Sequence, residues 1–245
     1  MKYVIFSDIH GNFEALEAVL IHCAPEDVGF YVCLGDVVGY GASPNECIER
    51  VRGLSESVCL RGNHDAAVTD PRERSFFHEV ALEGIAFTLG RLTEENREYL
   101  AQLPYVYSDH PRFIAVHASP WKPQAWEYVL DQIGAERAFG AMGTHRVAFI
   151  GHSHAPVIFT DDGQAERFSP GEPLMLDVQK QRYIINVGSV GQPRDGNPDA
   201  SYAVYDDEVD SVRLFRVQYD REKAAEKILK AGLPPVLAER LLVGY

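Results

Sequence analysis

Short apolar runs and amphipathic segments alternate along the first sixty residues of the chain. The apolar runs are rich in β-branched and aromatic side chains and predict three buried strands, over residues 1–6, 30–34 and 57–60. Helical spacing predicts a helix that begins after Asn12, its N-cap, and another over residues 44–52. This β-α-β-α-β order favours parallel strands joined by right-handed crossovers.

The middle of the chain has longer helical segments. Residues 73–102 predict a pair of helices packed on the sheet, and Thr93 is placed to cap the second of them. Further apolar runs predict strands over residues 112–116 and 146–150. Between these two strands, a helical stretch is expected to end near Phe139.

After residue 155 the pattern changes to short alternating segments separated by turns. These segments predict five strands, over residues 156–160, 166–168, 182–187, 201–206 and 211–217. We expect them to form a second sheet that is largely antiparallel. Asp220 is placed to cap a helix to about Lys230, and Pro234 and Pro235 begin a short final helix. Because no repeat or linker interrupts the chain, we expect a single domain, 1–245, with stacked sheets and outer helices.

Composition and charge narrow the function classes. The chain has 245 residues, of which 46% are hydrophobic, and a net charge of −13. This charge argues against a broad surface for nucleic acid or anionic membranes. No apolar run approaches the roughly 20 residues of a membrane span, and we find no signal-peptide pattern at the N-terminus. The four cysteines are scattered without a C-x-x-C pair, and Cys33 and Cys59, which lie in apolar runs, are expected to be reduced core residues, so a cytoplasmic location is predicted.

Polar side chains gather where the predicted strands end. Five strand ends carry Asp8 and His10, Asp36, Asn63 and His64, His117, and His152 and His154. The remaining four of the nine histidines lie in predicted helices or loops, where we interpret them as solvated or structural: His22, His78, His110 and His145. Because α/β folds place ligand sites at the carboxyl ends of strands, we expect the strand-end side chains to share one crevice.

Carboxylate, imidazole and amide donors suit divalent metal ions such as Mn, Fe, Co, Ni or Zn. The set contains no thiolate, which argues against a closed structural zinc site. Asp36 stands alone at its strand end and is the expected bridge between two ions. Two ions about 3.5–4 Å apart can hold a hydroxide between them and bind two phosphoryl oxygens for in-line attack. The alternative is that these residues are ordinary turn and cap residues, since Asp and Asn favour such positions.

The order of these motifs resembles the calcineurin-like metallophosphoesterase superfamily. The matching blocks are Asp8-Ile9-His10, Gly35-Asp36, Gly62-Asn63-His64-Asp65, His117 and Gly151-His152-Ser153-His154. The later stretch from Asn186 to Pro193 resembles the glycine-rich strand-loop of small bacterial and archaeal members. The resemblance implies an α/β fold of two stacked, mixed β-sheets, a β-sandwich, flanked by α-helices. It also implies a dinuclear metal centre.

The resemblance also assigns roles to individual residues. It places one metal ion on Asp8, His10, Asp36 and His154, and the other on Asp36, Asn63, His117 and His152. His64 would be a catalytic residue that stabilises the transition state or protonates the leaving oxygen. Asp65 is expected to orient the ring of His64. We expect two divalent ions, manganese first, with iron, nickel, cobalt or zinc as alternatives.

Substrate contacts are less constrained by the sequence. The candidates are Tyr40, Arg61 and Arg194, with Trp121 as a wall of the cleft. Each has a simpler interpretation, such as a solvated arginine at a strand end or an aromatic ring packed under a loop. The backbone amides of Gly188–Gly191 could bind an anion, or this segment could be a tight turn required by packing.

The expected function is therefore hydrolysis of small phosphodiesters, including cyclic nucleotides, or of phosphomonoesters. A serine/threonine protein phosphatase is disfavoured, because Gly39 and Tyr40 replace the Asp and Arg of that branch's Gly-Asp-x-Val-Asp-Arg-Gly motif. The acidic surface argues against the function of a nuclease of the same superfamily, so a nucleic-acid polymer is not expected as a partner. A catalytically silent scaffold is a further alternative, although every expected ligand is present.

Overall fold

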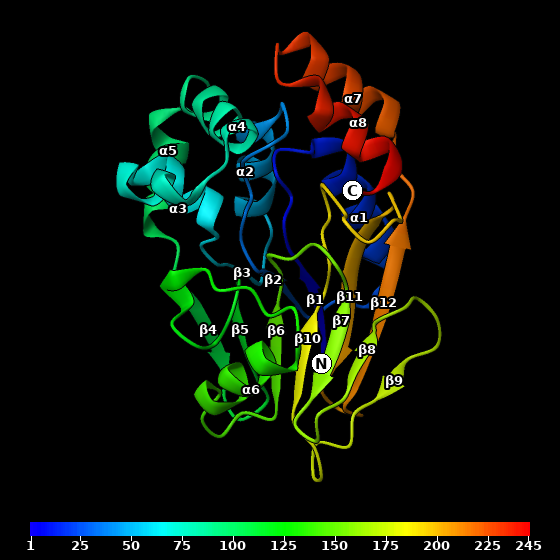
Figure 1. Ribbon diagram of the computed structural model, residues 1–245. Coiled ribbons are helices and arrows are strands. Elements are labelled where there is room, and N and C mark those ends of the chain that lie inside the picture. Colours follow the sequence, from blue (N-terminus) through cyan, green and yellow to red (C-terminus); the bar gives the residue numbers. More distant parts are fainter.

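Two six-stranded β-sheets lie face to face, with helices on their outer sides (Figure 1). The computed structural model describes all residues from 1 to 245. The first sheet has the order β3-β2-β1-β11-β12-β9. Its strands are β1 (Lys2–Phe6), β2 (Phe30–Cys33), β3 (Ser57–Cys59), β9 (Leu174–Met175), β11 (Ala200–Asp206) and β12 (Ser211–Val217).

The second sheet has the order β4-β5-β6-β10-β7-β8. Its strands are β4 (Val106–Asp109), β5 (Phe113–Val116), β6 (Val147–Ile150), β7 (Val157–Thr160), β8 (Ala165–Arg167) and β10 (Tyr183–Asn186).

Each sheet is built around three parallel strands. β1, β2 and β3 are parallel in the first sheet, and β5, β6 and β10 in the second. The expected fold class, two stacked mixed sheets flanked by helices, is confirmed. The prediction of a separate, largely antiparallel sheet after residue 155 is wrong, because those strands are divided between both sheets. A sequence pattern gives the period of a strand, whereas long-range packing selects its partner.

The alternation of side chains along the strands divides the core into layers. In β1, Tyr3 and Ile5 face the space between the two sheets, whereas Val4 and Phe6 join the cluster on the helical side. β6 alternates in the same way between the middle cluster and a third one that includes residues of α6 (Gln132–Ala141). Strands buried on both faces are apolar almost throughout, which explains the runs that predicted them.

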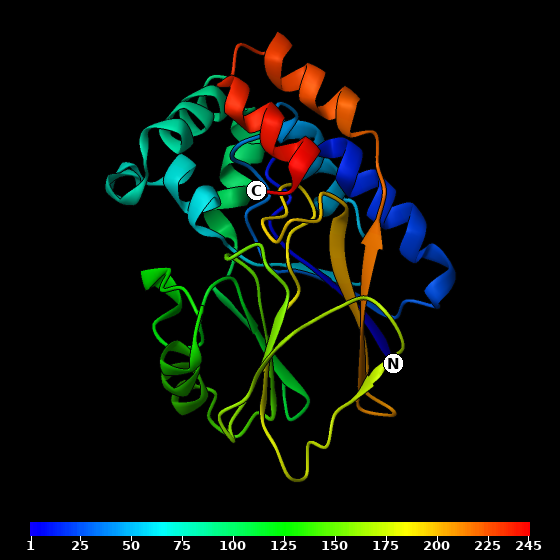
Figure 2. The ribbon, with the colours of Figure 1, turned by 45° about the vertical axis from the view of Figure 1, so that its right-hand side comes forward.

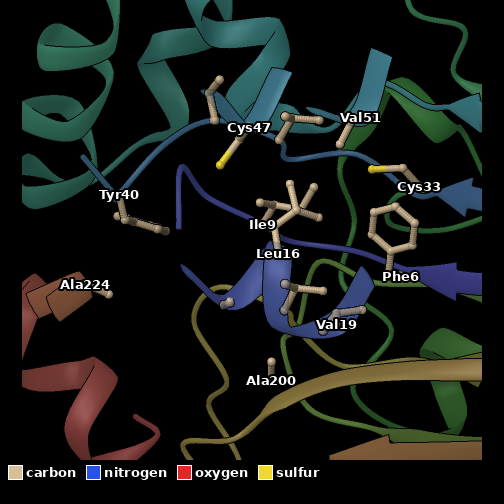
Figure 3. Packing of buried hydrophobic residues seen from close by; sticks show 14 of the residues in the cluster. Phe6, Ile9, Leu16, Val19, Cys33, Tyr40, Cys47, Val51, Ala200 and Ala224 are labelled. Atoms are coloured by element: carbon tan, nitrogen blue, oxygen red, sulfur yellow. The ribbon is translucent and has the colours of Figure 1, made fainter. Parts of the chain in front are cut away.

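The outer helices pack on the two faces of the sandwich. α1 (Phe13–Cys23), α2 (Pro44–Arg52), α7 (Arg221–Lys230) and α8 (Pro235–Val243) contribute to the cluster outside the first sheet. Figure 2 shows α1 and α6 on opposite sides of the sandwich. In Figure 3, Leu16 of α1 lies between Cys47 of α2 and Ala200 of β11. All four cysteines are buried and free.

Most helix boundaries follow from capping residues. Asn12, Thr93 and Asp220 each cap a helix as predicted, because their side-chain oxygens accept a backbone N–H three residues later at 3.0–3.2 Å. The expected pair of helices is present, as α4 (Glu79–Leu89) and α5 (Glu94–Gln102). Its predicted packing on the sheet is wrong, because the pair packs chiefly on α2 and α3 (Asn63–Thr69). None of the helices has both the length and the apolar character required to cross a bilayer.

The helix α3 and the strands β4 and β9 were not predicted. In α3, the residues Asn63 to Asp65 look like a polar strand end, yet they form the first helical turn. The sequence does contain a signal for this helix, which is the spacing of Gly62 and Asp65. An acid at the third helical position can accept the N–H of the N-cap residue. The Asp65 carboxylate does accept the Gly62 N–H, at 3.0 Å.

Asp65 ties α3 to the loop that follows β2. Its carboxylate is fully buried and accepts four backbone N–H groups. The donors are Asp36 at 2.8 Å, Val37 at 3.0 Å, Val38 at 3.2 Å and Gly62 at 3.0 Å. This one side chain therefore fixes the ends of β2 and β3 relative to each other.

We expect Asp65→Ala to lower the free energy of unfolding by at least about 3 kcal/mol, because each buried amide left without an acceptor costs about 1–3 kcal/mol. Urea unfolding at pH 7 with a chelator present measures this loss. Asp220→Ala is the matched control, since it removes one exposed cap bond and should lose about 1 kcal/mol. Equal losses in the two variants would contradict the role of Asp65.

Candidate metal centre

The carboxyl ends of the parallel strands of both sheets meet in one place. Backbone hydrogen bonds join the segments that follow the strands: Asp8 N–H donates to Gly35 O at 3.0 Å, and His10 N–H to Asp36 O at 2.9 Å. In the second sheet, Gly151 N–H donates to His117 O at 2.8 Å. The structure thereby brings the seven expected ligands together, with His64 beside them.

The first group of donors comprises Asp8, His10 and His154, and all three side chains are buried. The Nε2 atom of His154 lies 3.3 Å from Asp8 Oδ1 and 3.1 Å from His10 Nε2. His10 Nε2 is 3.7 Å from Asp8 Oδ1. These atoms are close enough to share one ion.

The second group comprises Asp36, His117 and His152, with Asn63 beside it. His117 Nε2 lies 3.3 Å from Asp36 Oδ2 and 3.1 Å from Asn63 Oδ1. Asp36 Oδ2 is also 3.7 Å from His10 Nε2, which belongs to the first group. Asp36 thus reaches both groups of donors, and it lies nearer to the second group than Asp8 does, whose Oδ1 is 3.9 Å from His117 Nε2.

Backbone carbonyls orient most of these imidazoles. The Nδ1 atoms of His10, His117 and His154 lie 3.1, 3.2 and 2.6 Å from the carbonyl oxygens of Val38, Leu34 and Gln192, respectively. An Nδ1–H that donates to a carbonyl leaves the Nε2 lone pair free to bind a metal ion. His152 is reversed, because its Nε2 lies 3.0 Å from Trp126 O and its Nδ1 is left for the centre.

The carboxylates show that the donor set fits cations. Asp8 Oδ2 accepts the His152 N–H at 2.9 Å, and Asp36 Oδ1 accepts the His64 N–H at 2.8 Å. The other oxygen of Asp8, Oδ1, is buried and has no hydrogen-bond partner. An unpaired buried carboxylate oxygen is strongly unfavourable in a protein, and a bound cation removes that penalty.

The charges of the centre shift the pKa values of its groups. Burial acts to raise the pKa of Asp36, but His117 and His64 outweigh it and hold that pKa well below its ordinary value. Burial acts to lower the pKa of His117, yet Asp36 outweighs it and raises that pKa to about 9. Burial lowers the pKa of His152 to about 3 and that of His154 to about 4. Two neutral imidazoles therefore lie beside two ionised carboxylates at neutral pH.

Backbone strain is concentrated at the same place. Five of the expected ligands have left-handed backbone angles, with φ between 50° and 65°: Asp8, His10, Asp36, His152 and His154. Gly62 and Gly151 are also required, since a Cβ at Gly62 would overlap the Asp36 carboxylate and one at Gly151 would overlap Ser7 Oγ. Such strain indicates that the positions of these ligands are strongly constrained.

A pocket of about 310 Å³ opens onto the centre. It is lined by four of the expected ligands and by His64, Tyr40 and Arg194. Two NH groups of Arg194 donate to Gln192 Oε1 at 2.8 and 3.2 Å, and its guanidinium lies 5.6 Å from the centroid of the Tyr40 ring. The structure therefore brings two of the three predicted substrate contacts to the pocket.

Arg61 is not among the residues that line the pocket. Its guanidinium donates to Tyr105 Oη at 3.0 Å and to the carbonyl oxygens of Leu100 and Ala101 at the end of α5. The structure thus gives Arg61 a structural role in place of the predicted substrate contact. The bonds to helix-end carbonyls were not visible in the sequence, because α5 is distant from Arg61 along the chain.

One further expectation is corrected, and one of two open alternatives is supported. Asp65 does not orient the His64 ring, since its oxygens accept backbone amides and His64 Nδ1 has no hydrogen-bond partner. Burial lowers the pKa of His64 well below its ordinary value. In the glycine-rich loop, the N–H groups of Gly188, Val190 and Gly191 all donate within the protein, as a packing turn requires.

The aromatic walls of the pocket were missed. Phe76, Phe77, His78, Trp126 and Tyr128 line it, whereas Trp121 does not. Phe76 and Phe77 looked like part of a helix, and His78 was interpreted as solvated or structural. These residues follow no motif spacing, and two loops distant in the sequence bring them together. The one signal in the sequence was that Trp126 follows the strand end at His117 by only a few residues.

Known proteins resemble this chain along its whole length. Residues 1–210 match the family described as the calcineurin-like phosphoesterase superfamily domain. An uncharacterized protein of Methanocaldococcus jannaschii is 39% identical over 244 residues, which cover 98% of this chain and 97% of that protein.

Solved structures agree with this assignment. A metallophosphoesterase from Sphaerobacter thermophilus is 37% identical, with a TM-score of 0.88 over 100% of this chain and 99% of that one. The hypothetical protein PH1004 from Pyrococcus horikoshii shares the fold, at 22% identity and a TM-score of 0.81 over 100% of this chain and 98% of that one. This chain belongs to the calcineurin-like phosphoesterase superfamily.

Proposed function

We propose that this protein is a metal-dependent hydrolase of small phosphate esters with a dinuclear centre. The observation that carries the proposal is the convergence of two carboxylates, one amide and four imidazoles, together with the buried Asp8 Oδ1, which has no hydrogen-bond partner. Carboxylate and imidazole donors of this kind suit divalent transition metals. Membership of the superfamily supports the same chemistry.

The donor groups suggest how two ions are held. Asp8, His10, Asp36 and His154 would bind one ion, and Asp36, Asn63, His117 and His152 the other. The position of Asp36 between the two groups supports its role as the bridge. Manganese is our first expectation, with iron, nickel, cobalt or zinc as alternatives. When bound, the ions supply a nucleophile at neutral pH and polarise the phosphoryl oxygens.

The residues of the chain complete the site around the ester. His64 lines the pocket and donates its backbone N–H to Asp36, so its ring is held beside the proposed bridge. Its role in the proposal is to stabilise the leaving oxygen. Arg194 is the one arginine or lysine that lines the pocket, and a guanidinium matches the geometry of a phosphate. Tyr40 supports that guanidinium with its ring.

The size and charge of the site favour a small ester. A volume of about 310 Å³ is at the lower end of the range for small-molecule pockets. The net charge of −13 opposes a nucleic-acid polymer. Hydrolysis of a panel of chromogenic mono- and diesters with added manganese tests the proposal. Absence of turnover by the metal-loaded protein would instead favour a scaffold that has kept the fold.

We expect Asp36→Asn and His64→Ala to fail in different ways. Asp36→Asn removes the shared charge and should lose metal and activity together. His64→Ala should retain about two ions per chain, while kcat falls by about 10²–10³, the usual contribution of one hydrogen-bond donor that stabilises charge in the transition state. Elemental analysis of the purified variants, beside ester hydrolysis, measures both effects.

The matched control for these variants is His145→Ala. His145 lies away from the pocket, where its ring bonds to Ser108 Oγ at 2.8 Å. It should keep both metal and activity. Wild-type activity in either Asp36→Asn or His64→Ala would remove the assigned role of that residue.

Arg194→Ala should raise KM by about tenfold, because a charge-assisted hydrogen bond to the ester contributes about 1.5–3 kcal/mol. Metal content should stay unchanged, since Arg194 is not among the proposed ligands. Arg61→Ala is the control for loss of an arginine outside the pocket, and its KM should match the wild type. An unchanged KM in Arg194→Ala would remove the proposed contact.

A further inference from the structure

The mouth of the pocket is lined by aromatic rings from two separate segments. Phe76 and Phe77 lie on the connection between α3 and α4, whereas Trp126 and Tyr128 lie on the loop between β5 and α6. A hydrogen bond joins the two segments, because Trp126 Nε1 donates to Glu73 Oε2 at 2.9 Å. The two walls are therefore held together at the entrance.

Some of these rings already have partners. The edge of Phe77 packs on His64, with ring centroids 4.8 Å apart and an interplanar angle of 85°. One face of Tyr128 stacks on His152 at 4.0 Å and 22°. Tyr128 is nevertheless 50% exposed, so its other face is open. These contacts fix the rings without filling the space in front of them.

Phe76 has no aromatic or cationic partner in the structure and is 83% exposed, although it lines the pocket. Phe76 is not a lone exposed ring, because Phe77, Trp126 and Tyr128 line the same pocket, and apolar groups gathered at a pocket are typical of a binding site. The pocket also holds no lysine, and Arg194 is its one arginine. The mouth therefore suits an uncharged planar group, while charge is accepted only deeper, at Arg194 and the metal ligands.

We propose that the mouth is a stacking site for an aromatic ring, so that the substrates are phosphate esters carrying a planar ring, such as nucleosides. This inference rests on the proposed function of the centre. The ring of the substrate packs on the open faces of Tyr128 and Phe76, and its phosphate reaches Arg194 and the metal ligands. Stacking of a base on one protein ring contributes about 1–3 kcal/mol and tolerates different bases.

Two matched pairs of esters test the proposal. Benzyl phosphate and cyclohexylmethyl phosphate have the same charge and similar leaving groups and differ in the aromatic ring. Adenosine 5′-monophosphate and ribose 5-phosphate differ in the base. Each pair is assayed as monoesters and as their methyl diesters, with manganese. We expect kcat/KM to be at least about tenfold higher for the aromatic member.

Variants locate the effect at the mouth. Phe76→Ala and Tyr128→Ala should each reduce the preference by about fivefold or more, and Phe76→Tyr should restore it because the ring is kept. Trp121→Ala is the matched control, since Trp121 is 39% exposed but does not line the pocket. If only benzyl phosphate is preferred over its cyclohexyl counterpart, the substrates are simple aryl esters. If adenosine 5′-monophosphate is also preferred over ribose 5-phosphate, the substrates include nucleoside esters. Equal rates within both pairs overturn the proposal.

A binding measurement keeps this proposal separate from the proposed function. The chain has two tryptophans, so Trp121→Phe leaves Trp126, in the pocket, as the sole tryptophan, and its fluorescence is excited selectively at the red edge of the absorption band. Adenosine and benzyl alcohol, which carry no phosphate, should quench it, whereas ribose should not. Quenching by a protein that hydrolyses no ester would support the stacking site while removing the hydrolase. Absence of quenching by both aromatic probes would overturn the stacking site whatever the activity.

Discussion

The burial of two carboxylates beside four imidazoles is the constraint on which the structure depends. Asp8 and Asp36 are almost inaccessible to water, and Asp8 Oδ1 has no hydrogen-bond partner. Such a group is unfavourable unless positive charge lies beside it. Five of the expected ligands also have left-handed backbone angles, and glycines are needed to make room for them. Without nearby positive charge, nothing in the site would offset these unfavourable features. The fold accepts these unfavourable features in one place, where cations can offset them.

Both sheets are needed to build that place. The first sheet supplies expected ligands at the ends of β1, β2 and β3, and the second at the ends of β5 and β6. The loop after β10 adds the carbonyl that orients His154 and the guanidinium of Arg194. The middle core cluster sets the spacing between the sheets, with rings such as Tyr205 and Phe113 packed edge to face across it, 5.8 Å apart. A cavity in that cluster would therefore disturb the metal centre at a distance.

The sequence predicted those parts of the structure that depend on local chemistry. Apolar runs marked the strands, and Asn12, Thr93 and Asp220 marked helix starts, because each effect acts within a few residues. The ligands were visible because each follows a strand end. Sheet partners, the short helix α3 and the position of Arg61 were not predicted, since long-range packing decides them. The rings of the pocket mouth come from two segments far apart in the sequence, the connection between α3 and α4 and the connection between β5 and α6. No local pattern indicates that these two segments meet, so only the three-dimensional structure brings Phe76 near Trp126.

Trp126 connects the rings of the pocket mouth with the expected metal ligands. Its carbonyl oxygen lies 3.0 Å from His152 Nε2 and accepts a hydrogen bond from that ring. Its own ring lines the pocket, and its Nε1–H donates to Glu73 Oε2 on the opposite wall. Most ligands are oriented by carbonyls next to strand ends, such as Val38 and Leu34, which the sheets hold rigidly. His152 depends instead on a loop residue. The pocket wall at Trp126 is therefore mechanically coupled to His152, an expected ligand of the second group of donors. A change at Trp126 would therefore act on His152 as well as on the pocket, whereas the exposed Phe76 has no aromatic or cationic partner through which it could do the same.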